Sequence, residues 1–304
     1  MMGQEKNNLN LKNVRGELSF DEPMSKHTSW RVGGPAAILF KPEDVSDLQL
    51  FLSQQTTKLP IYWVGLGSNL LVRDGGIEGV VILTQGMLVN LSCENKTQVY
   101  AEAGVPCPKV AKFAVKNDLQ GAEFLAGIPG TIGGALAMNA GAFGGETWEK
   151  VISVETLNAQ GQRITRKPNE YNIAYRQVDG PKDEWFLSAR FQFQVGDGKK
   201  SLENMKALLE KRNKTQPTNQ PSCGSVFRNP PKDHAARLIE ASGLKGYCIG
   251  GACVSDKHAN FIVNTGNATA HDIESLINEV KQKVFKTFGV DLIREAHIVG
   301  VANA

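Results

Sequence analysis

The feature that most constrains this chain is a glycine-rich segment at residues 124–146, FLAGIPGTIGGALAMNAGAFGGE, with seven glycines and five alanines in 23 positions. Its only charged residue is Glu146. Each glycine in a regular element costs roughly 0.5–1 kcal/mol, because so much chain freedom is lost on folding. A flexible linker would explain the glycines, but a solvated tether would not carry seven large apolar side chains: Phe124, Leu125, Ile128, Ile132, Leu136, Met138 and Phe143. We therefore predict a packed segment whose bare backbone approaches something bulky.

A second glycine loop, GLGSNLLVRDGG at residues 65–76, follows a predicted strand. Successive N–H groups in tight turns form anion-binding concavities, so two such loops on either side of a cleft would suit a dinucleotide. The loop lacks the third glycine of GxGxxG, and no GxxxxGK[ST] motif occurs, so neither a Rossmann site nor a P-loop is predicted. The residues alone leave an alternative open, namely that both loops are only tight packing turns.

Composition and charge limit the classes of function. The chain has 304 residues, of which 41% are hydrophobic and 21% charged, and this predicts a globular protein of two or three domains. A net charge of +3 with dispersed Lys and Arg does not indicate a nucleic-acid partner. The polar amino terminus, and the lack of an apolar run of membrane-span length, predict a soluble cytoplasmic protein with no membrane partner. Nothing in the residues predicts an oligomeric state.

The cysteines and histidines predict neither a disulfide framework nor a metal site. Five cysteines are an odd number and none are spaced as CxxC, so we expect buried free thiols at Cys93, Cys107, Cys223, Cys248 and Cys253. The five histidines form no HExxH or comparable cluster.

Hydrophobic periodicity predicts an α+β chain with a domain boundary near residues 196–200. Strands are expected at 36–40, in three short pieces across 60–84, at 98–103, in a hairpin over 151–166, and at 186–195, with short strands in 260–264 and 292–300. Helices are expected from about Pro42, at 106–117, within 201–217, at 234–242 and at 270–288. Thr269 and Asp272 predict a capping box at the start of the last helix.

Several motifs, in order along the chain, resemble one known family. They are HTSWRVGGPAA at 27–37, VGLGSNLLVRDGGIEGVVI at 64–82, GAEFLAGIPGTIGGALAMNAGAFGGE at 121–146, AYR at 174–176, CGSVFRNP at 223–230, HANFIVN at 258–264 and LIREAHIVG at 292–300. With these motifs the chain resembles UDP-N-acetylenolpyruvoylglucosamine reductase, the MurB family. Only residues 177–185 lie between Arg176 and the predicted strand FLSARF, which leaves no room for the inserted tyrosine loop of the family's longer type. The resemblance is therefore to the shorter type.

This resemblance implies an α+β fold with an FAD-binding domain of the vanillyl-alcohol-oxidase (PCMH) type at residues 1–196, in subdomains of about 20–85 and 90–196. A substrate-binding C-terminal domain would follow at 197–304. The implied activity is that of an FAD-dependent oxidoreductase, UDP-N-acetylmuramate dehydrogenase, which takes hydride from NADPH and reduces an enolpyruvyl sugar nucleotide for peptidoglycan and cell-wall synthesis. We expect non-covalent FAD, because neither glycine loop contains a His or Cys for covalent attachment.

The resemblance also assigns site residues. Arg176 would stabilise the substrate carboxylate, Ser225 would deliver a proton, and Glu295 would assist if it carries or shares a proton. Cofactor contacts would come from Gly65, Leu66, Gly67, Ser68, Asn69, Leu70, Ala126, Gly127, Ile128, Pro129, Gly130, Gly133, Gly134 and Asn139. Substrate contacts would come from Tyr175, Arg228, Asn229, Lys257 and Asn260. Without the resemblance, the catalytic three read more simply as a surface ion-pair partner, a turn hydroxyl and a strand-edge carboxylate.

Two other functions stay open at this point. Another flavoenzyme of the same fold, such as an alcohol oxidase or a 2-hydroxy-acid dehydrogenase, would keep the glycine loops and lack the serine and glutamate. A nucleotide-binding regulatory module would have no redox role and would purify without yellow colour.

Overall fold

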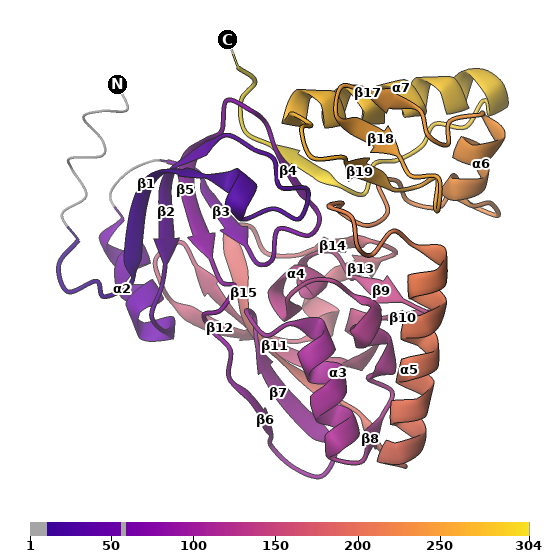
Figure 1. Ribbon diagram of the computed structural model, residues 1–304. Coiled ribbons are helices and arrows are strands. Elements are labelled where there is room, and N and C mark those ends of the chain that lie inside the picture. The colour runs from indigo at the N-terminus through magenta and orange to yellow at the C-terminus, as the bar shows by residue number, and fades with distance from the viewer. Residues whose placement is uncertain (1–10, 56–58, 304) are drawn as a thin grey trace. The chain divides into compact units, whose positions relative to one another are not determined.

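The computed structural model describes residues 11–55 and 59–303, and its contacts divide the chain into two units. Unit 1 consists of Met1–Phe20, Ile38–Leu66 and Gly79–Leu209, and unit 2 of Asp21–Ala37, Gly67–Glu78 and Glu210–Ala304. Both units mix helices and strands, so the predicted α+β class is confirmed (Figure 1). The linear domain division at residues 196–197 stays a prediction, since the contacts group two early segments with the C-terminal part of the chain.

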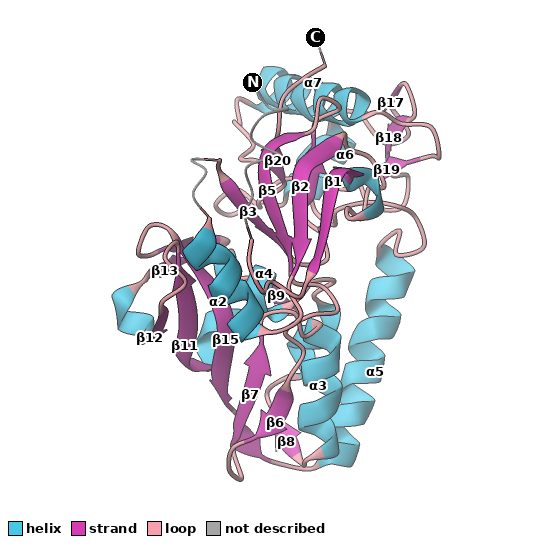
Figure 2. Cartoon of the chain, turned by 90° about the vertical axis from the view of Figure 1, so that its left-hand side faces the viewer, coloured by secondary structure: helices cyan, strands magenta, loops and turns pink. Residues whose placement is uncertain are grey.

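Unit 1 contains a five-stranded antiparallel sheet in the order β12-β11-β15-β7-β6. Helix α3 lies between this sheet and α5 (Figures 1 and 2), and Val110 of α3 and Met205 of α5 share a buried cluster with Val99 and Phe191 of the strands. The unit boundary at Leu209 falls within α5. The bounds are β6 Leu91–Cys93, β7 Gln98–Glu102, β11 Val151–Asn158, β12 Arg163–Arg166, β15 Glu184–Gln192, α3 Cys107–Lys116 and α5 Gly198–Thr215. The strands and helices predicted from periodicity in these regions are confirmed.

A four-stranded sheet in the order β1-β2-β5-β3 packs against α2. Its elements are β1 Glu17–Pro23, β2 Pro35–Lys41, α2 Val45–Gln54, β3 Ile61–Val64 and β5 Ile77–Leu83, and the unit boundaries fall within β1, β2 and β5. The rings of Phe40 and Phe51 stack with centroids 4.1 Å apart. The helix predicted to start at Pro42 begins at Val45 instead, because the Asp44 side chain accepts the Asp47 N–H (2.8 Å) as an N-cap.

The glycine-rich segment is folded and packed, as predicted. It forms the 3-10 helix η2 Glu123–Gly127, the helix α4 Ile132–Ala137 and a hairpin of β9 Gly141–Ala142 with β10 Gly145–Glu146. Leu125, Ile132 and Leu136 are buried in the core of unit 1. Part of the glycine content serves the protein's own packing, because a Cβ at Gly127 would lie 2.4 Å from the Phe143 ring. The remaining short strands of this unit are β8 Leu119–Gln120, β13 Asn172–Ala174, β14 Gln177–Asp179 and β16 Gln194–Val195.

Unit 2 has a core of two helices and a three-stranded antiparallel sheet, β17-β18-β19. Its elements are β4 Leu70–Val72, α6 Ala235–Ala241, β17 Cys248–Ile249, β18 Ala252–Val254, β19 Ile262–Asn264, α7 Ala270–Phe288 and β20 His297–Val299, with β20 parallel to β4. The predicted capping box is confirmed, since Thr269 Oγ1 accepts the Asp272 N–H (3.0 Å) and Asp272 Oδ2 accepts the Thr269 N–H (2.9 Å).

Segment Asp21–Ala37 belongs to unit 2 through Trp30, whose side chain is fully buried. The indole Nε1–H donates to the Ile262 carbonyl (2.8 Å), and the Asn264 amide donates to the Trp30 carbonyl (2.9 Å). Both partners lie in or at the end of β19. The indole therefore fills the core of a unit built mainly from the other end of the chain.

Segment Gly67–Glu78 is attached to α7 by two charged residues. The Arg73 guanidinium donates two hydrogen bonds of 2.8 Å to the Glu274 carboxylate, which hold the pKa of Glu274 below its ordinary value. The Asp74 carboxylate accepts the N–H groups of Ala270 and His271 (2.9 Å each) in the first turn of α7. Bidentate geometry and a capped helix terminus together fix this segment on unit 2.

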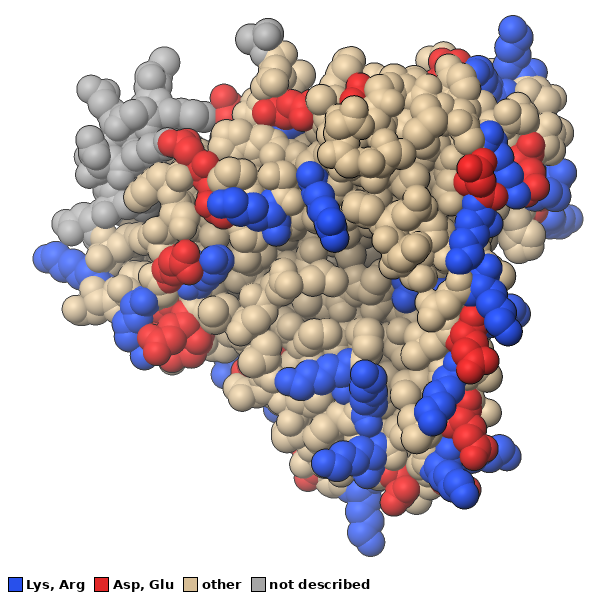
Figure 3. All heavy atoms as spheres, viewed as in Figure 1, with Lys and Arg blue, Asp and Glu red and all other residues tan. Residues whose placement is uncertain are grey.

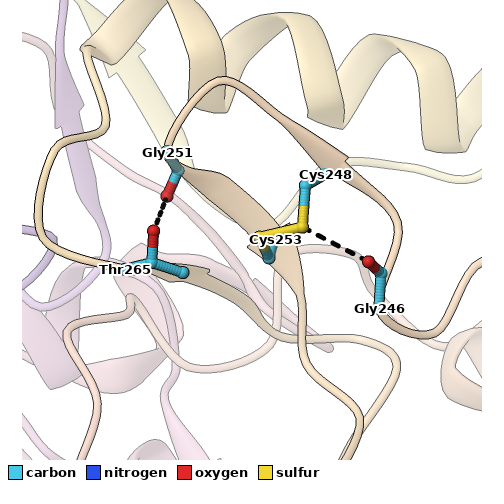
Figure 4. Close-up of a disulfide and its surroundings, with 5 residues drawn as sticks. All are labelled: Gly246, Cys248, Gly251, Cys253 and Thr265. Carbon is cyan, nitrogen blue, oxygen red and sulfur yellow. Dashed lines mark hydrogen bonds between the residues drawn. A yellow bond between two sulfur atoms is a disulfide. The ribbon is translucent and has the colours of Figure 1, made fainter.

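Cys248 and Cys253 form a disulfide across the β17–β18 hairpin (Figure 4). They are direct partners in the antiparallel register, with Cα atoms 4.1 Å apart. The expectation of free thiols is wrong for this pair, because a two-residue turn at Gly250 and Gly251 places cysteines five positions apart opposite each other. Cys107 and Cys223 are buried free thiols, as predicted, whereas Cys93 is free and exposed.

We expect a thiol-alkylating reagent at about pH 8 to modify Cys93 in the folded, unreduced protein and to leave Cys107 and Cys223 unmodified. Burial raises the pKa of Cys107 to about 12. Burial, and secondarily the charge of Glu295, raises the pKa of Cys223 well above its ordinary value. Neither buried thiol therefore forms a reactive thiolate.

Peptide mass mapping checks this pattern. Adding a mild reductant should add labels at Cys248 and Cys253, and the denatured, reduced protein, as a control, should be labelled at all five positions. Labelling of Cys107 in the folded protein would contradict its burial.

Candidate active site

Ser225 and Glu295 lie on neighbouring segments of unit 2. The Glu295 N–H donates to the Val226 carbonyl at 2.8 Å, so this main-chain hydrogen bond joins Glu295 to the residue that follows Ser225. The Glu295 charge also reaches the thiol of Cys223, where, after burial, it is the second cause of the raised pKa. The structure thus joins the main-chain segments of two residues that are 70 positions apart in the sequence.

Asn260 holds the segment that follows Ser225. Its Oδ1 accepts the Phe227 N–H (3.0 Å), its Nδ2 donates to the Phe227 carbonyl (2.8 Å), and its own carbonyl accepts the Val226 N–H (2.9 Å). Asn260 is only 3% exposed, so removing the amide would leave buried main-chain groups unsatisfied. Its side chain therefore fixes the serine loop, while its predicted contact with substrate stays a prediction.

The second glycine loop, residues 65–76, is joined to Glu295 through Asn69. The Asn69 amide donates to the Glu295 carbonyl (3.0 Å), and the Asn69 carbonyl accepts the His297 N–H (2.9 Å). From there β4 pairs in parallel with β20, with Leu70 opposite His297. Gly67 has a positive φ of 64°, and a Cβ there would lie 2.0 Å from a neighbouring carbonyl oxygen. Within unit 2, residues predicted for the cofactor and for catalysis are therefore neighbours.

The other predicted substrate residues of unit 2 have different surroundings. The Arg228 Nε is buried and has no hydrogen-bond partner within the residues that the structure describes. The Asn229 side chain accepts the Ala235 N–H (3.1 Å) at the start of α6, and the exposed Lys257 donates to the Asn213 carbonyl. Arg228 thus keeps a buried donor that a ligand could satisfy, whereas Asn229 and Lys257 already make bonds within the protein.

In unit 1, Arg176 occupies the turn between β13 and β14. Its φ is 56°, and its guanidinium donates to the carbonyls of Gly141 (2.8 Å) and Asn139 (3.2 Å). The neighbouring Tyr175 is 46% exposed, with its ring centroid 5.1 Å from the guanidinium carbon. Only β14 and residues 180–183 separate Arg176 from β15, as expected for the shorter type.

Gly65 and Thr131 form a cradle in unit 1 that suits a polar ligand group. Thr131 is 2% exposed, and its Oγ1 is buried without a partner among the described residues. A Cβ at Gly65 would lie 2.2 Å from that oxygen, and at Gly134 the nearest atom to an added Cβ would be the same oxygen at 3.9 Å. An orphaned hydroxyl beside bare backbone fits a diphosphate. Sequence reasoning missed Thr131, whose only signal is its place inside the glycine-rich segment.

In the other segment predicted to contact the cofactor, several main-chain N–H groups are already bonded within the protein. The N–H groups of Ile128, Gly130 and Gly133 donate to carbonyls of the protein at 2.9–3.1 Å. Ala126 to Ile128 are buried, whereas Leu66 and Pro129 are exposed. Cofactor contact along residues 126–130 stays a prediction.

Surface charge, metal-binding side chains and helix hydropathy are further features of the described chain. On the face drawn in Figure 3, Lys and Arg side chains lie among Asp and Glu, in keeping with the small net charge. Residues 11–55 and 59–303 contain no cluster of three or more His, Cys, Asp or Glu side chains that could hold a metal ion. No helix in the described part of the chain is long and apolar enough to span a membrane.

Family models match both halves of this arrangement. Residues 36–166 match the model of an FAD-binding domain, and residues 216–299 match the C-terminal domain of UDP-N-acetylenolpyruvoylglucosamine reductase. Together these matches define the class of the chain as an FAD-binding oxidoreductase.

The chain belongs to the UDP-N-acetylenolpyruvoylglucosamine reductase family. It is 57% identical over 290 residues to the reductase of Methylococcus capsulatus, covering 95% of each chain, and 53% identical over 310 residues to that of Coxiella burnetii, covering 96% of this chain and 98% of the relative. The crystal structure of the Thermus caldophilus reductase is 31% identical and superposes with a TM-score of 0.81 over 94% of this chain and 99% of that one. The family resemblance and the fold predicted from the motifs are confirmed.

Proposed function

We propose that this enzyme reduces UDP-N-acetylglucosamine enolpyruvate to UDP-N-acetylmuramate in the cytoplasmic synthesis of peptidoglycan precursors, with NADPH as the hydride source. The observation that carries the proposal is the pairing of the Ser225 and Glu295 segments, held by Asn260 and Asn69, in a chain of this family. When bound, FAD supplies to the substrate the hydride that NADPH provides.

Arg176 is the proposed stabiliser of the substrate carboxylate. Hydride addition next to a carboxylate builds negative charge on that group, and a planar guanidinium can donate two parallel hydrogen bonds to it. The two carbonyls that accept from Arg176 orient the guanidinium before substrate arrives. Glu295 adds to this stabilisation if it shares a proton with the developing enolate-like group.

Ser225 is the proposed proton donor to the carbanionic carbon. Serine is a weak acid in water, but the intermediate is a strong base, so a hydroxyl held in place can serve as the acid. The bonds that Asn260 makes to the following residues hold the loop that bears the hydroxyl. Ser225, Glu295 and Arg176 together form the proposed catalytic group.

The proposed binding residues follow the two glycine loops and the C-terminal unit. Residues 65–70, 126–130, Gly133 and Gly134 would contact non-covalent FAD, and the orphaned Thr131 hydroxyl joins them as a donor to the diphosphate. Tyr175, Arg228, Asn229, Lys257 and Asn260 are proposed on the substrate side. The buried, unpartnered Arg228 Nε favours Arg228 for an anionic group.

The proposed activity is tested by turnover with a defined substrate. We expect yellow protein whose flavin NADPH reduces anaerobically, and continuous NADPH oxidation only when UDP-N-acetylglucosamine enolpyruvate is added. Flavin reduction by an alcohol or a 2-hydroxy acid in place of NADPH would contradict the proposal and support another flavoenzyme. Colourless protein that does not bind added FAD would support a nucleotide-binding regulatory module.

A further inference from the structure

A ring of hydrogen bonds in unit 1 connects the glycine-rich segment to the loop that carries Arg176. At its centre is Asn139, which is 2% exposed and has a φ of 46°. Its amide Nδ2 donates to Glu146 Oε2 (2.8 Å) and to the Ala174 carbonyl (3.1 Å), and its Oδ1 accepts the Trp148 N–H (3.1 Å). Both amide hydrogens and the amide oxygen of Asn139 are therefore bound within the protein.

Arg176 closes this ring from the other side. Its Nη1 donates to the carbonyl of Asn139 (3.2 Å) and its Nη2 to the carbonyl of Gly141 (2.8 Å). Asn139 thus holds the carbonyl two residues before Arg176, while the Arg176 side chain holds the carbonyl of Asn139. A Cβ at Gly141 would lie 2.5 Å from the Gly145 carbonyl oxygen and 3.0 Å from Arg176 Nη1, so a side chain there would crowd both the hairpin and the guanidinium. Glu146 is the register partner of Gly141 in the β9–β10 hairpin.

The backbone at both ends of the ring is in the left-handed region. Asn139 and Arg176 have φ values of 46° and 56°. Asparagine adopts this region more readily than most residues, whereas for arginine it is uncommon. Such conformations are energetically unfavourable and persist where the surroundings over-determine them, often at functional sites. The hydrogen bonds of the ring supply that over-determination.

We propose that Asn139, supported by Glu146, is a positioning residue that sets the place and the plane of the Arg176 guanidinium. This inference rests on the proposed role of Arg176 at the substrate carboxylate. A guanidinium has five N–H donors, and the two carbonyls engage two of them in a fixed orientation. Glu146 thus acts through the buried Asn139 amide on Arg176, the residue proposed to bind the substrate carboxylate.

The test measures flavin reduction and flavin reoxidation separately in the Asn139→Asp variant. This substitution keeps the shape of the side chain but replaces the amide donor with an oxygen that faces the Glu146 carboxylate and the Ala174 carbonyl. We expect anaerobic stopped-flow to show reoxidation of reduced flavin by the enolpyruvyl substrate slowed about 10- to 100-fold, the effect of a misplacement of about 1 Å. Reduction of the flavin by NADPH should stay within about twofold of wild type.

Matched variants control for the chemistry of the change. Asn158→Asp removes one amide donor from an exposed turn, where Asn158 Nδ2 donates to Gln162 (2.9 Å), and should change neither half-reaction. Glu146→Gln keeps an acceptor for Asn139 and should retain reoxidation within about threefold, whereas Glu146→Ala should slow it toward the Asn139→Asp value. If position 146 required only a negative charge, Glu146→Gln would slow reoxidation as much as Glu146→Ala does.

Arg176→Ala, measured in parallel, separates this inference from the proposed function. If Arg176→Ala leaves reoxidation unchanged, the role proposed for Arg176 is wrong. If Arg176→Ala slows reoxidation but Asn139→Asp does not, the positioning role is wrong, and it is equally wrong if both half-reactions of Asn139→Asp fall together. Should Asn139→Asp fail to fold or to hold FAD, Asn139→Gly, which tolerates the left-handed backbone and lacks the amide, is judged by the same outcomes.

Discussion

Ser225→Ala is expected to slow reoxidation of the reduced flavin by the enolpyruvyl substrate by about 10²- to 10⁴-fold, the usual contribution of a positioned general acid. The proposed proton transfer occurs only after hydride has reached the substrate, so reduction of the flavin by NADPH should stay within about twofold of wild type. Anaerobic stopped-flow absorbance of the flavin measures each half-reaction separately.

The serine loop makes this experiment selective. Asn260 and Glu295 bind the main chain of the residues after Ser225, so loss of the hydroxyl should leave the loop in place. Ser242→Ala is a matched control, because the Ser242 hydroxyl donates to the Leu238 carbonyl (2.9 Å) at the end of α6. An equal fall in both half-reactions, or no fall in either, would show that Ser225 is not the proton donor.

Trp30→Ala is expected to lower the free energy of unfolding by about 3–5 kcal/mol, as for other fully buried aromatic side chains. The loss combines a large cavity with an Ile262 carbonyl left without its donor. Since domains are stable by only about 5–15 kcal/mol, the change removes a large part of the total. Urea denaturation followed by circular dichroism measures it.

Trp30→Phe separates packing from hydrogen bonding at this position. The phenyl ring retains most of the buried area but lacks the Nε1–H, so we expect a smaller loss of about 1–3 kcal/mol. A midpoint for Trp30→Ala close to that of wild type would mean that the indole contributes little to the core in which the structure places it.

The long periodic elements were predictable from the sequence because their signals are local. The helix α7 shows its apolar spacing and its capping box within 20 residues, and β15 shows its alternation within ten. The disulfide was not predicted, since only the pairing of β17 with β18 places Cys248 opposite Cys253. The attachment of Asp21–Ala37 to unit 2 was also missed, because Trp30 and its partner Ile262 are 232 positions apart.

The candidate site was predictable as a set of residues but not as a set of contacts. The motifs identified Asn139 and Asn260 as ligand contacts, whereas the structure shows both amides bonded to the protein's own chain. Thr131 carries no motif signal, and only its burial without a partner distinguishes it. Hydrogen-bond partners and burial are properties of the folded chain. Sequence patterns therefore indicate which functional group a residue carries, but not which groups surround it.

Unit 2 is assembled from three stretches of chain, and this has a consequence for synthesis on the ribosome. Trp30 leaves the exit tunnel long before Ile262 and Asn264 exist, since 232 and 234 positions separate them. At about 5–20 residues per second, the indole waits on the order of ten seconds or more for its partners. We infer that unit 2 matures only after residues 262–264 have been synthesised, and that chains terminated before these residues expose an aromatic surface to chaperones and proteases.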